Sequence, residues 1–169
     1  MLQKPLQKNI PLYQKAYEVI KRDILTGKIS PGSKISENTL AEQLQISRTP
    51  LREAISQLKK DGLLITDNVS TKVMVLNQQD FEGLYECRIA LEKQAIKSVV
   101  DEITDNQLKE LNDLLDRAEE LLAQGDYMET LMCNTRFHEV LTKACPNKRL
   151  VQFLEQARSL LLLYRANSL

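Results

Sequence analysis

The chain of 169 residues contains one histidine, no tryptophan and three cysteines. A single histidine leaves little for general acid–base catalysis, and we identify no nucleophile–base pair, so an enzyme is not expected. The cysteines are odd in number and widely spaced, at Cys87, Cys133 and Cys145. They form no local disulfide framework and no Cys-x-x-Cys site, which favours a reducing cytoplasmic location.

Long apolar runs are also missing from the sequence. The N-terminal segment MLQKPLQKNIPLYQK lacks the apolar core of a signal peptide. The longest apolar run, LLLLY, is far shorter than the ~18 residues that a membrane span needs. The hydrophobic fraction of 43% is nevertheless ordinary for a globular protein. These features predict a globular cytoplasmic protein with no membrane partner.

The net charge is zero over the whole chain but not within its halves. Lys plus Arg and Asp plus Glu both number 23, which by itself argues against a nucleic-acid partner. Residues 1–76 contain 12 basic and 7 acidic residues, a net charge of +5, whereas residues 77–169 contain 11 and 16, a net charge of −5. This asymmetry predicts two domains, 1–76 and 77–169, with different partners.

The first domain has the pattern of three helices followed by a hairpin. Apolar residues recur at steps of three and four and predict helices over about 11–26, 36–44 and 48–60, with a break at 45–47 between the last two. Two short β-prone runs, 63–66 and 71–76, flank a polar turn and predict a hairpin. Helix, helix, turn, helix and hairpin is the order of a winged helix-turn-helix.

After residue 77 every periodic run predicts a helix. The runs span about 78–100, 105–124, 126–144 and 147–166, with short breaks between them. Short loops make consecutive helices antiparallel, so the fold class is mainly α, a winged helix-turn-helix followed by an antiparallel helical bundle. The last helix is apolar over a wide face, and we expect that exposed face to support self-association into a homodimer.

The start of the third helix carries residue types suited to DNA. Arg48 and Arg52 stand four apart on one helical face, and arginine makes bidentate contacts with guanine. Ser47 and Thr49 offer hydroxyls for phosphate or base contacts, although either could instead cap the helix. Solvated surface arginines and helix-turn-helix patterns also occur in proteins that never bind DNA, so the pattern alone leaves both interpretations open.

This stretch resembles the DNA-binding domain of the GntR family of bacterial transcription regulators. The matching pieces are I-x-x-G-x-I-x-P-G-x-K at 24–34, L-A-E-x-L-x-I-S-R-T-P-L-R-E-A at 40–54 and L-x-x-D-G-L at 58–63. The resemblance implies a regulator that binds double-stranded, pseudo-palindromic operator DNA as a homodimer. By the same resemblance, the DNA contacts fall on Asn38, Ser47, Arg48, Thr49 and Arg52.

At the wing the chain departs from the family pattern, which has glycine and a basic residue at the tip. The tip would span 68–72, and the neighbouring Asp67 would repel phosphate. Lys72 is the only nearby cation, so it is the residue expected to contact DNA there.

The second half resembles the effector-binding domain of the FadR-like branch of that family, the FCD type. Its signature R-x-x-L-E-x-x-A begins at Arg88, and N-x-x-F-H at 134–138 matches a later motif of that domain. The resemblance implies a small carboxylate effector bound through Arg88, Asn134 and His138. It also implies a divalent metal, such as zinc, nickel or manganese, with Asn134 and His138 as its first two ligands.

Two departures make the metal the less favoured interpretation. Asn134 is a neutral ligand, weaker than a carboxylate for a divalent ion. His138 is the only histidine, whereas the family uses three, and we expect two or three helices of the usual effector domain to be absent. His138 is then a partly buried polar group, and Arg88 could pair with a neighbouring helix instead of an effector.

The sequence therefore leaves four alternative functions. The first is a cytoplasmic transcription regulator that responds to an effector. The second is a truncated regulator that binds DNA but has no effector response. The third is an interaction module whose helical half recruits another protein, and an enzyme is the fourth and weakest.

Overall fold

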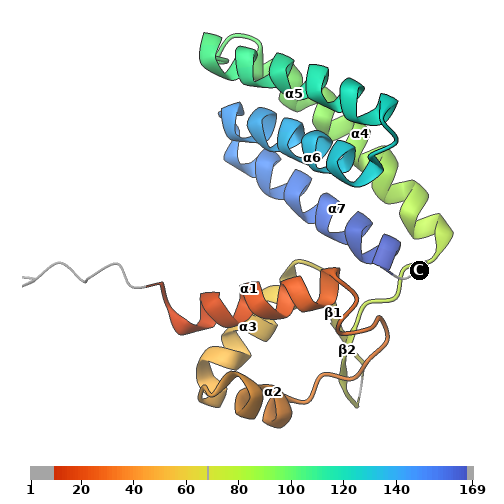
Figure 1. The fold of residues 1–169 in the computed structure, drawn as a ribbon. Helices are drawn as coiled ribbons and strands as arrows, with labels where there is room; N and C mark the ends of the chain where they lie inside the picture. Colours follow the sequence, from red (N-terminus) through yellow and green to blue (C-terminus); the bar gives the residue numbers. More distant parts are fainter. Residues whose placement is uncertain (1–9, 68, 167–169) are drawn as a thin grey trace, which may run out of the picture. The chain divides into compact units, whose positions relative to one another are not determined.

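The computed structural model describes residues 10–67 and 69–166, and the chain divides into two compact units. One unit comprises Met1–Leu84 together with Arg158–Leu169, and the other comprises Tyr85–Ala157. Figure 1 follows the order of the helices and strands along the chain. The two ends of the sequence therefore contribute to the same unit.

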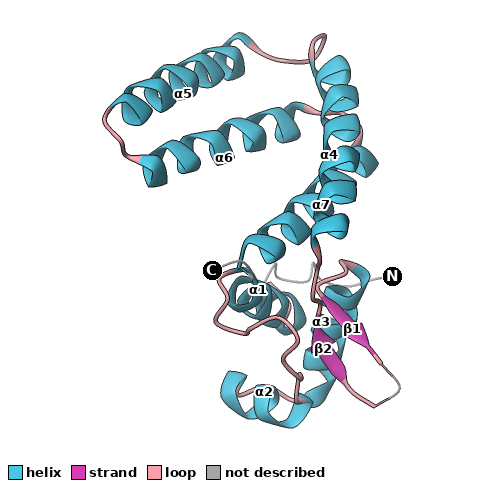
Figure 2. Cartoon of the chain, turned by 90° about the vertical axis from the view of Figure 1, so that its right-hand side faces the viewer, coloured by secondary structure: helices cyan, strands magenta, loops and turns pink. Residues whose placement is uncertain are grey.

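The first unit contains a winged helix-turn-helix, as the sequence predicts. Its helices are α1 (Leu12–Leu25), α2 (Glu37–Leu44) and α3 (Arg48–Lys60). The strands β1 (Leu64–Thr66) and β2 (Thr71–Val73) follow as an antiparallel hairpin, which Figure 2 shows in magenta. Fold class and element order are confirmed, and the strands are shorter than the β-prone runs.

A third extended segment, which the sequence does not predict, joins the hairpin. Lys34 forms an antiparallel bridge with Lys72 of β2. The backbone N–H of Ile35 donates to the carbonyl oxygen of Thr71 at 2.8 Å, and that of Val73 donates to the carbonyl oxygen of Ser33 at 3.0 Å. The loop before α2 thereby satisfies the outer edge of β2 and ties the hairpin to the helical part.

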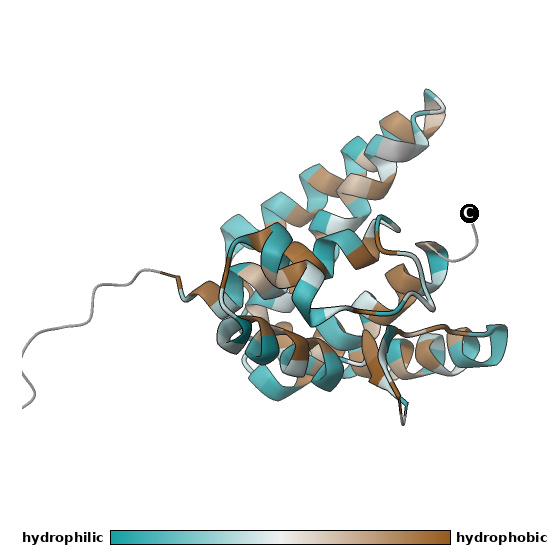
Figure 3. Ribbon diagram, turned by 90° about the horizontal axis from the view of Figure 1, so that it is seen from below, coloured by the Kyte–Doolittle hydropathy of each residue, from teal (hydrophilic) through white to brown (hydrophobic). Residues whose placement is uncertain are grey.

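The core of this unit lies between α1, α3 and the hairpin. Apolar residues, brown on the ribbon of Figure 3, alternate with hydrophilic ones along the helices, as amphipathic helices require. The buried cluster contains Ile20, Ile24, Leu51, Ile55, Leu58, Leu63, Leu64, Val73 and Leu163. The last of these belongs to the C-terminal helix, so the N-terminal unit is completed by residues from the far end of the chain.

The turn between α2 and α3 uses a left-handed residue that is not glycine. Gln45 has φ 52° and ψ 42° and ends α2. The backbone N–H of Ile46 then donates to the carbonyl oxygen of Ala41 at 3.1 Å, which closes the helix end. At the other end of α2 the hydroxyl of Ser36 accepts from the backbone N–H of Thr39 at 3.3 Å and caps the helix.

Helices predicted after residue 77 are also confirmed. They are α4 (Gln78–Val99), α5 (Asp105–Ala123), α6 (Tyr127–Ala144) and α7 (Lys148–Ala166). Thr104 and Gln107 form a capping box at the start of α5. Within the unit Tyr85–Ala157, α5 and α6 pack side by side (Figure 1), and a small core forms from Ala95, Val99, Cys145, Leu150 and Leu154.

The expectation of a wide exposed apolar face on the last helix is wrong. Leu150, Leu154, Leu161 and Leu163 of α7 are all buried, while Phe153 and Leu162 remain 57% and 40% exposed. Periodicity identifies an apolar face but not the surface that covers it, and here two different cores share that task.

The far end of α7 belongs to the first unit. Leu160 lies against Gly62, and the ring of Tyr164 stacks on Phe81 at 4.6 Å between centroids. Among the described residues, no helix is both long and apolar enough to span a bilayer.

Candidate DNA interface and effector site

The start of α3 has no side-chain cap. Ser47 is extended at the N-cap position, yet its hydroxyl makes no capping hydrogen bond, so the alternative in which it caps the helix is wrong. Ser47, Arg48 and Thr49 are exposed. The first N–H groups of a helix have no partner within the helix and attract anions, so this end can bind a phosphate.

An open hollow of about 460 Å³ adjoins this helix end. Its lining residues come from α2, from the turn and from the start of α3: Asn38, Ala41, Glu42, Gln45, Ile46, Ser47 and Arg48. The structure therefore brings three of the predicted DNA contacts, Asn38, Ser47 and Arg48, to one surface. Within the described part of the chain, Arg48 forms no ion pair and is available to a ligand.

Arg52, in contrast, is already paired. Its Nε donates to Oε2 of Glu37 at 2.8 Å, and the two side chains are 63% and 39% exposed. A pair this exposed contributes little to stability, but it holds the guanidinium beside the start of α2. Glu37 is a residue of this surface that the sequence analysis missed, and its position in the first turn of α2 was the available signal.

Lys72 and Asp67 form an ion pair within the wing. Lys72 Nζ lies 2.6 Å from Oδ2 of Asp67, while Oδ1 of Asp67 accepts from the backbone N–H groups of Val69 and Ser70 at 3.0 and 2.8 Å. The hydrogen bond from Lys72, followed by those from Val69 and Ser70, holds the pKa of Asp67 well below its usual value. Asp67 is ionised at neutral pH, and its negative charge offsets the positive charge of Lys72.

Two parts of the wing prediction have different outcomes. Lys72 lies within β2 and not at the tip, with its charge opposed by Asp67. Asn68, the first residue of the predicted tip, lies outside the described residues. Lys72 as a DNA contact stays a prediction.

Arg88 and His138 meet between α4 and α6. Arg88 Nε donates to Oε1 of Glu92 at 2.8 Å, and a terminal nitrogen of Arg88 lies 3.2 Å from Nε2 of His138. His138 Nδ1 lies 3.4 Å from the same Glu92 oxygen. Asn134 is exposed one turn before His138. Two signature residues that are 50 positions apart in the sequence thus form one half-buried cluster.

The cluster does not fit a divalent metal. A guanidinium can only donate, so Nε2 of His138 is the acceptor and the ring proton is assigned to Nδ1, which faces Glu92. A metal on Nε2 would have to replace the cation of Arg88. Over the ranges that the structure describes, no three His, Cys, Asp or Glu side chains gather where they could hold a metal ion.

Comparisons with known families divide the chain in two. The family described as bacterial regulatory proteins, gntR family, matches residues 12–73, and the FCD domain matches residues 83–169.

Individual proteins agree with these matches. An uncharacterized HTH-type transcriptional regulator of Bacillus subtilis, YdhC, is 34% identical over 92% of this chain and 70% of its own length. The Nta operon transcriptional regulator of Aminobacter aminovorans is 36% identical over 72% of this chain, which corresponds to 58% of that relative. The solved structure of Escherichia coli McbR/YncC has a TM-score of 0.70 at 22% identity, over 94% of this chain and 74% of that one.

Proposed function

This chain belongs to the GntR family of bacterial regulatory proteins and carries an FCD domain, and from that premise we propose that it regulates transcription by binding a pseudo-palindromic operator as a homodimer. Residues 1–76 serve as the DNA-binding domain and residues 77–169 as the effector and dimerisation domain. The site of action is the cytoplasm, and no catalytic step is part of the proposal.

The exposed start of α3 is the observation that carries the DNA part. Arg48 is accessible and forms no ion pair within the described residues, and it stands at the helix end that enters the major groove in helix-turn-helix proteins. Ser47 and Thr49 beside it are exposed for phosphate contacts. Asn38 lines the same hollow from α2, and Arg52 follows one turn later on α3.

Alanine substitution of the two arginines tests this assignment. Arg48→Ala and Arg52→Ala should each weaken operator binding by about 1–3 kcal/mol and relax base preference, because bidentate base contacts are lost. Fluorescence anisotropy with operator and scrambled duplexes measures both effects. Arg22→Ala is the matched control, since Arg22 is an exposed arginine of α1. Operator binding equal to that of the parent protein in both variants would show that α3 is not the reading helix.

Homodimerisation follows from the geometry of operator recognition. Two copies related by a two-fold axis can read half-sites about one helical turn apart. Light scattering at micromolar concentration should give twice the mass of the chain. A monomer under those conditions would remove the dimer from the proposal.

A small carboxylate is the effector that the Arg88 cluster would accept. Arg88 uses two of its nitrogens on Glu92 and His138 and can present its remaining donors to an anion. A ligand that binds only the folded chain raises the thermal midpoint. We expect dicarboxylates to raise the thermal midpoint of the parent protein but not that of Arg88→Ala. The control is Arg136→Ala, which removes an exposed arginine that pairs with Glu110 and should keep the shift.

The second candidate function is a regulator without an effector response. It rests on Glu92 already compensating the charge of Arg88. No midpoint shift with dicarboxylates, or with zinc, nickel or manganese, would favour it. The third alternative is a protein-interaction module whose helical half recruits another protein.

A further inference from the structure

A lysine from outside the β1–β2 hairpin, Lys34, lies beside the wing. We propose that Lys34, on the extended segment beside β2, contacts the DNA phosphate backbone in the place where a wing lysine would act. The inference rests on the proposed DNA binding and names one further residue for it.

Backbone pairing places Lys34 and Lys72 on one face of the small sheet. The two residues are direct partners in an antiparallel bridge, and side chains of directly opposed residues project to the same side. Ile65, the other partner of Lys72, is 40% exposed on that face. The opposite face holds Leu64 and Val73, which are buried in the core. The lysine pair therefore lies on the solvent face of the wing.

Charge compensation distinguishes the two lysines. Lys72 Nζ lies 2.6 Å from the carboxylate of Asp67, which offsets its charge. Lys34 is exposed and has no acidic partner within the described residues. Because Asp67 offsets the charge of Lys72, the uncompensated positive charge on this face is that of Lys34, and a phosphate there would be attracted mainly by Lys34.

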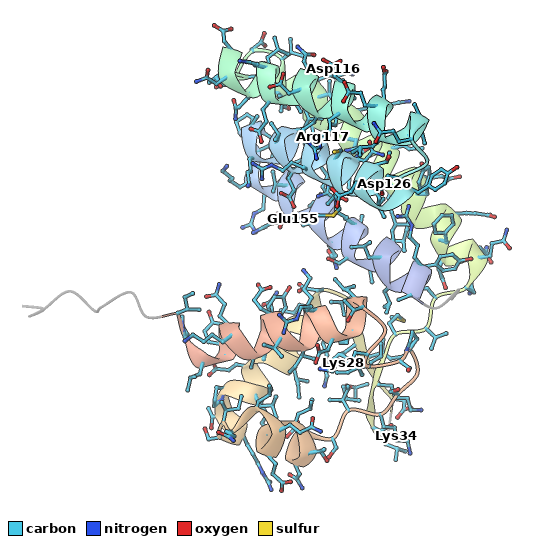
Figure 4. All side chains as sticks on the ribbon, in the orientation of Figure 1. Lys28, Lys34, Asp116, Arg117, Asp126 and Glu155 are labelled. Carbon is cyan, nitrogen blue, oxygen red and sulfur yellow. The ribbon has the colours of Figure 1, made fainter. Side chains whose placement is uncertain are left out.

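The position of Lys34 in the first unit also suits a phosphate contact. Figure 4 shows the side chain of Lys34 beside the hairpin, on the side of the first unit where α2 lies. Helix α2 contributes Asn38 to the hollow at the start of α3. Lys34 also precedes the N-cap of α2, Ser36, by two residues, so the same segment fixes both. One DNA duplex lying along α2 could reach the reading helix and the wing lysine together.

A salt titration of DNA binding tests the proposal. Each phosphate contact adds about 0.9 to the slope of log K against log salt concentration. Lys34→Gln keeps most of the side-chain stem and should lower that slope by about 0.9, with a roughly three- to tenfold loss of affinity that is equal for operator and scrambled duplexes. Lys34→Arg should keep both the slope and the affinity.

Two further variants make the test specific. Lys28→Gln is the matched control, because Lys28 is 73% exposed but pairs with Asp23 at 3.1 Å. It should leave the slope unchanged. Asp67→Asn keeps an acceptor for the turn and releases Lys72, so the double variant Lys34→Gln/Asp67→Asn should regain the lost slope. Circular dichroism melts of each variant establish that the fold is retained.

The outcomes separate this inference from the function on which it rests. If the parent protein binds no DNA, both fall. If Arg48→Ala loses operator binding while Lys34→Gln keeps the parent slope and affinity, the inference about Lys34 falls and the function stands. A loss confined to operator DNA would assign Lys34 to base reading and overturn its role as a phosphate contact.

Discussion

Gln45 shows how a single residue can carry strain for the reading helix. It occupies the left-handed region at φ 52°, where a side chain costs about 1–2 kcal/mol and glycine costs no such strain. This left-handed conformation ends α2 at Leu44, and α3 begins at Arg48, three residues after Gln45. The apolar spacing predicts the break between α2 and α3 at 45–47. It does not identify the strained residue, because glutamine is not a turn signal.

Replacing this residue should therefore stabilise the protein. We expect Gln45→Gly to raise the free energy of unfolding by about 0.5–1 kcal/mol, the relief of left-handed strain less the added backbone entropy of glycine in the unfolded chain. Urea denaturation followed by circular dichroism measures the change. Gln43→Gly is the control. Because Gln43 lies within α2, this substitution should lower the free energy of unfolding by about 1 kcal/mol. Equal losses in both variants would show that Gln45 is not strained.

At the scale of helices and strands, local pattern predicted most of what the structure contains. All seven helices of the described residues follow from apolar spacing, and two of them begin at residue types that favour the N-cap position, Ser36 and Thr104. The extended segment around Lys34 was missed. Its pairing partner is β2, nearly 40 residues later, and a bridge of one residue leaves no alternation to detect.

The candidate interfaces were predicted less completely, for a related reason. Asn38, Ser47 and Arg48, which the family motif selects as DNA contacts, line one hollow in the structure. The acidic partners that change what the cations can do, Glu37 for Arg52 and Glu92 for Arg88, depend on side-chain geometry. A pattern of spacing shows where a cation stands on its helix, but the ion pair appears only when the neighbouring elements are in place.

For the molecule as a whole, the two halves of the sequence carry opposite net charges. A net charge of +5 over residues 1–76 favours approach to phosphate, whereas −5 over residues 77–169 disfavours it. Charge does not describe how the chain is packed, however. Residues from the acidic half complete the core of the basic one, because Leu163 is fully buried with Ile20, Leu51 and their neighbours.

This shared core predicts that a substitution near the C-terminus destabilises the DNA-binding unit. Leu163→Ala should lower its free energy of unfolding by about 2–5 kcal/mol, because a buried leucine is replaced by a cavity. Leu162→Ala, next to it but 40% exposed, should cost well under half as much. Urea denaturation gives both values, and operator binding near the Leu163→Ala transition should fall with the folded fraction. Equal effects of the two substitutions would mean that α7 does not contribute to this core, and that the winged helix is stable on its own residues.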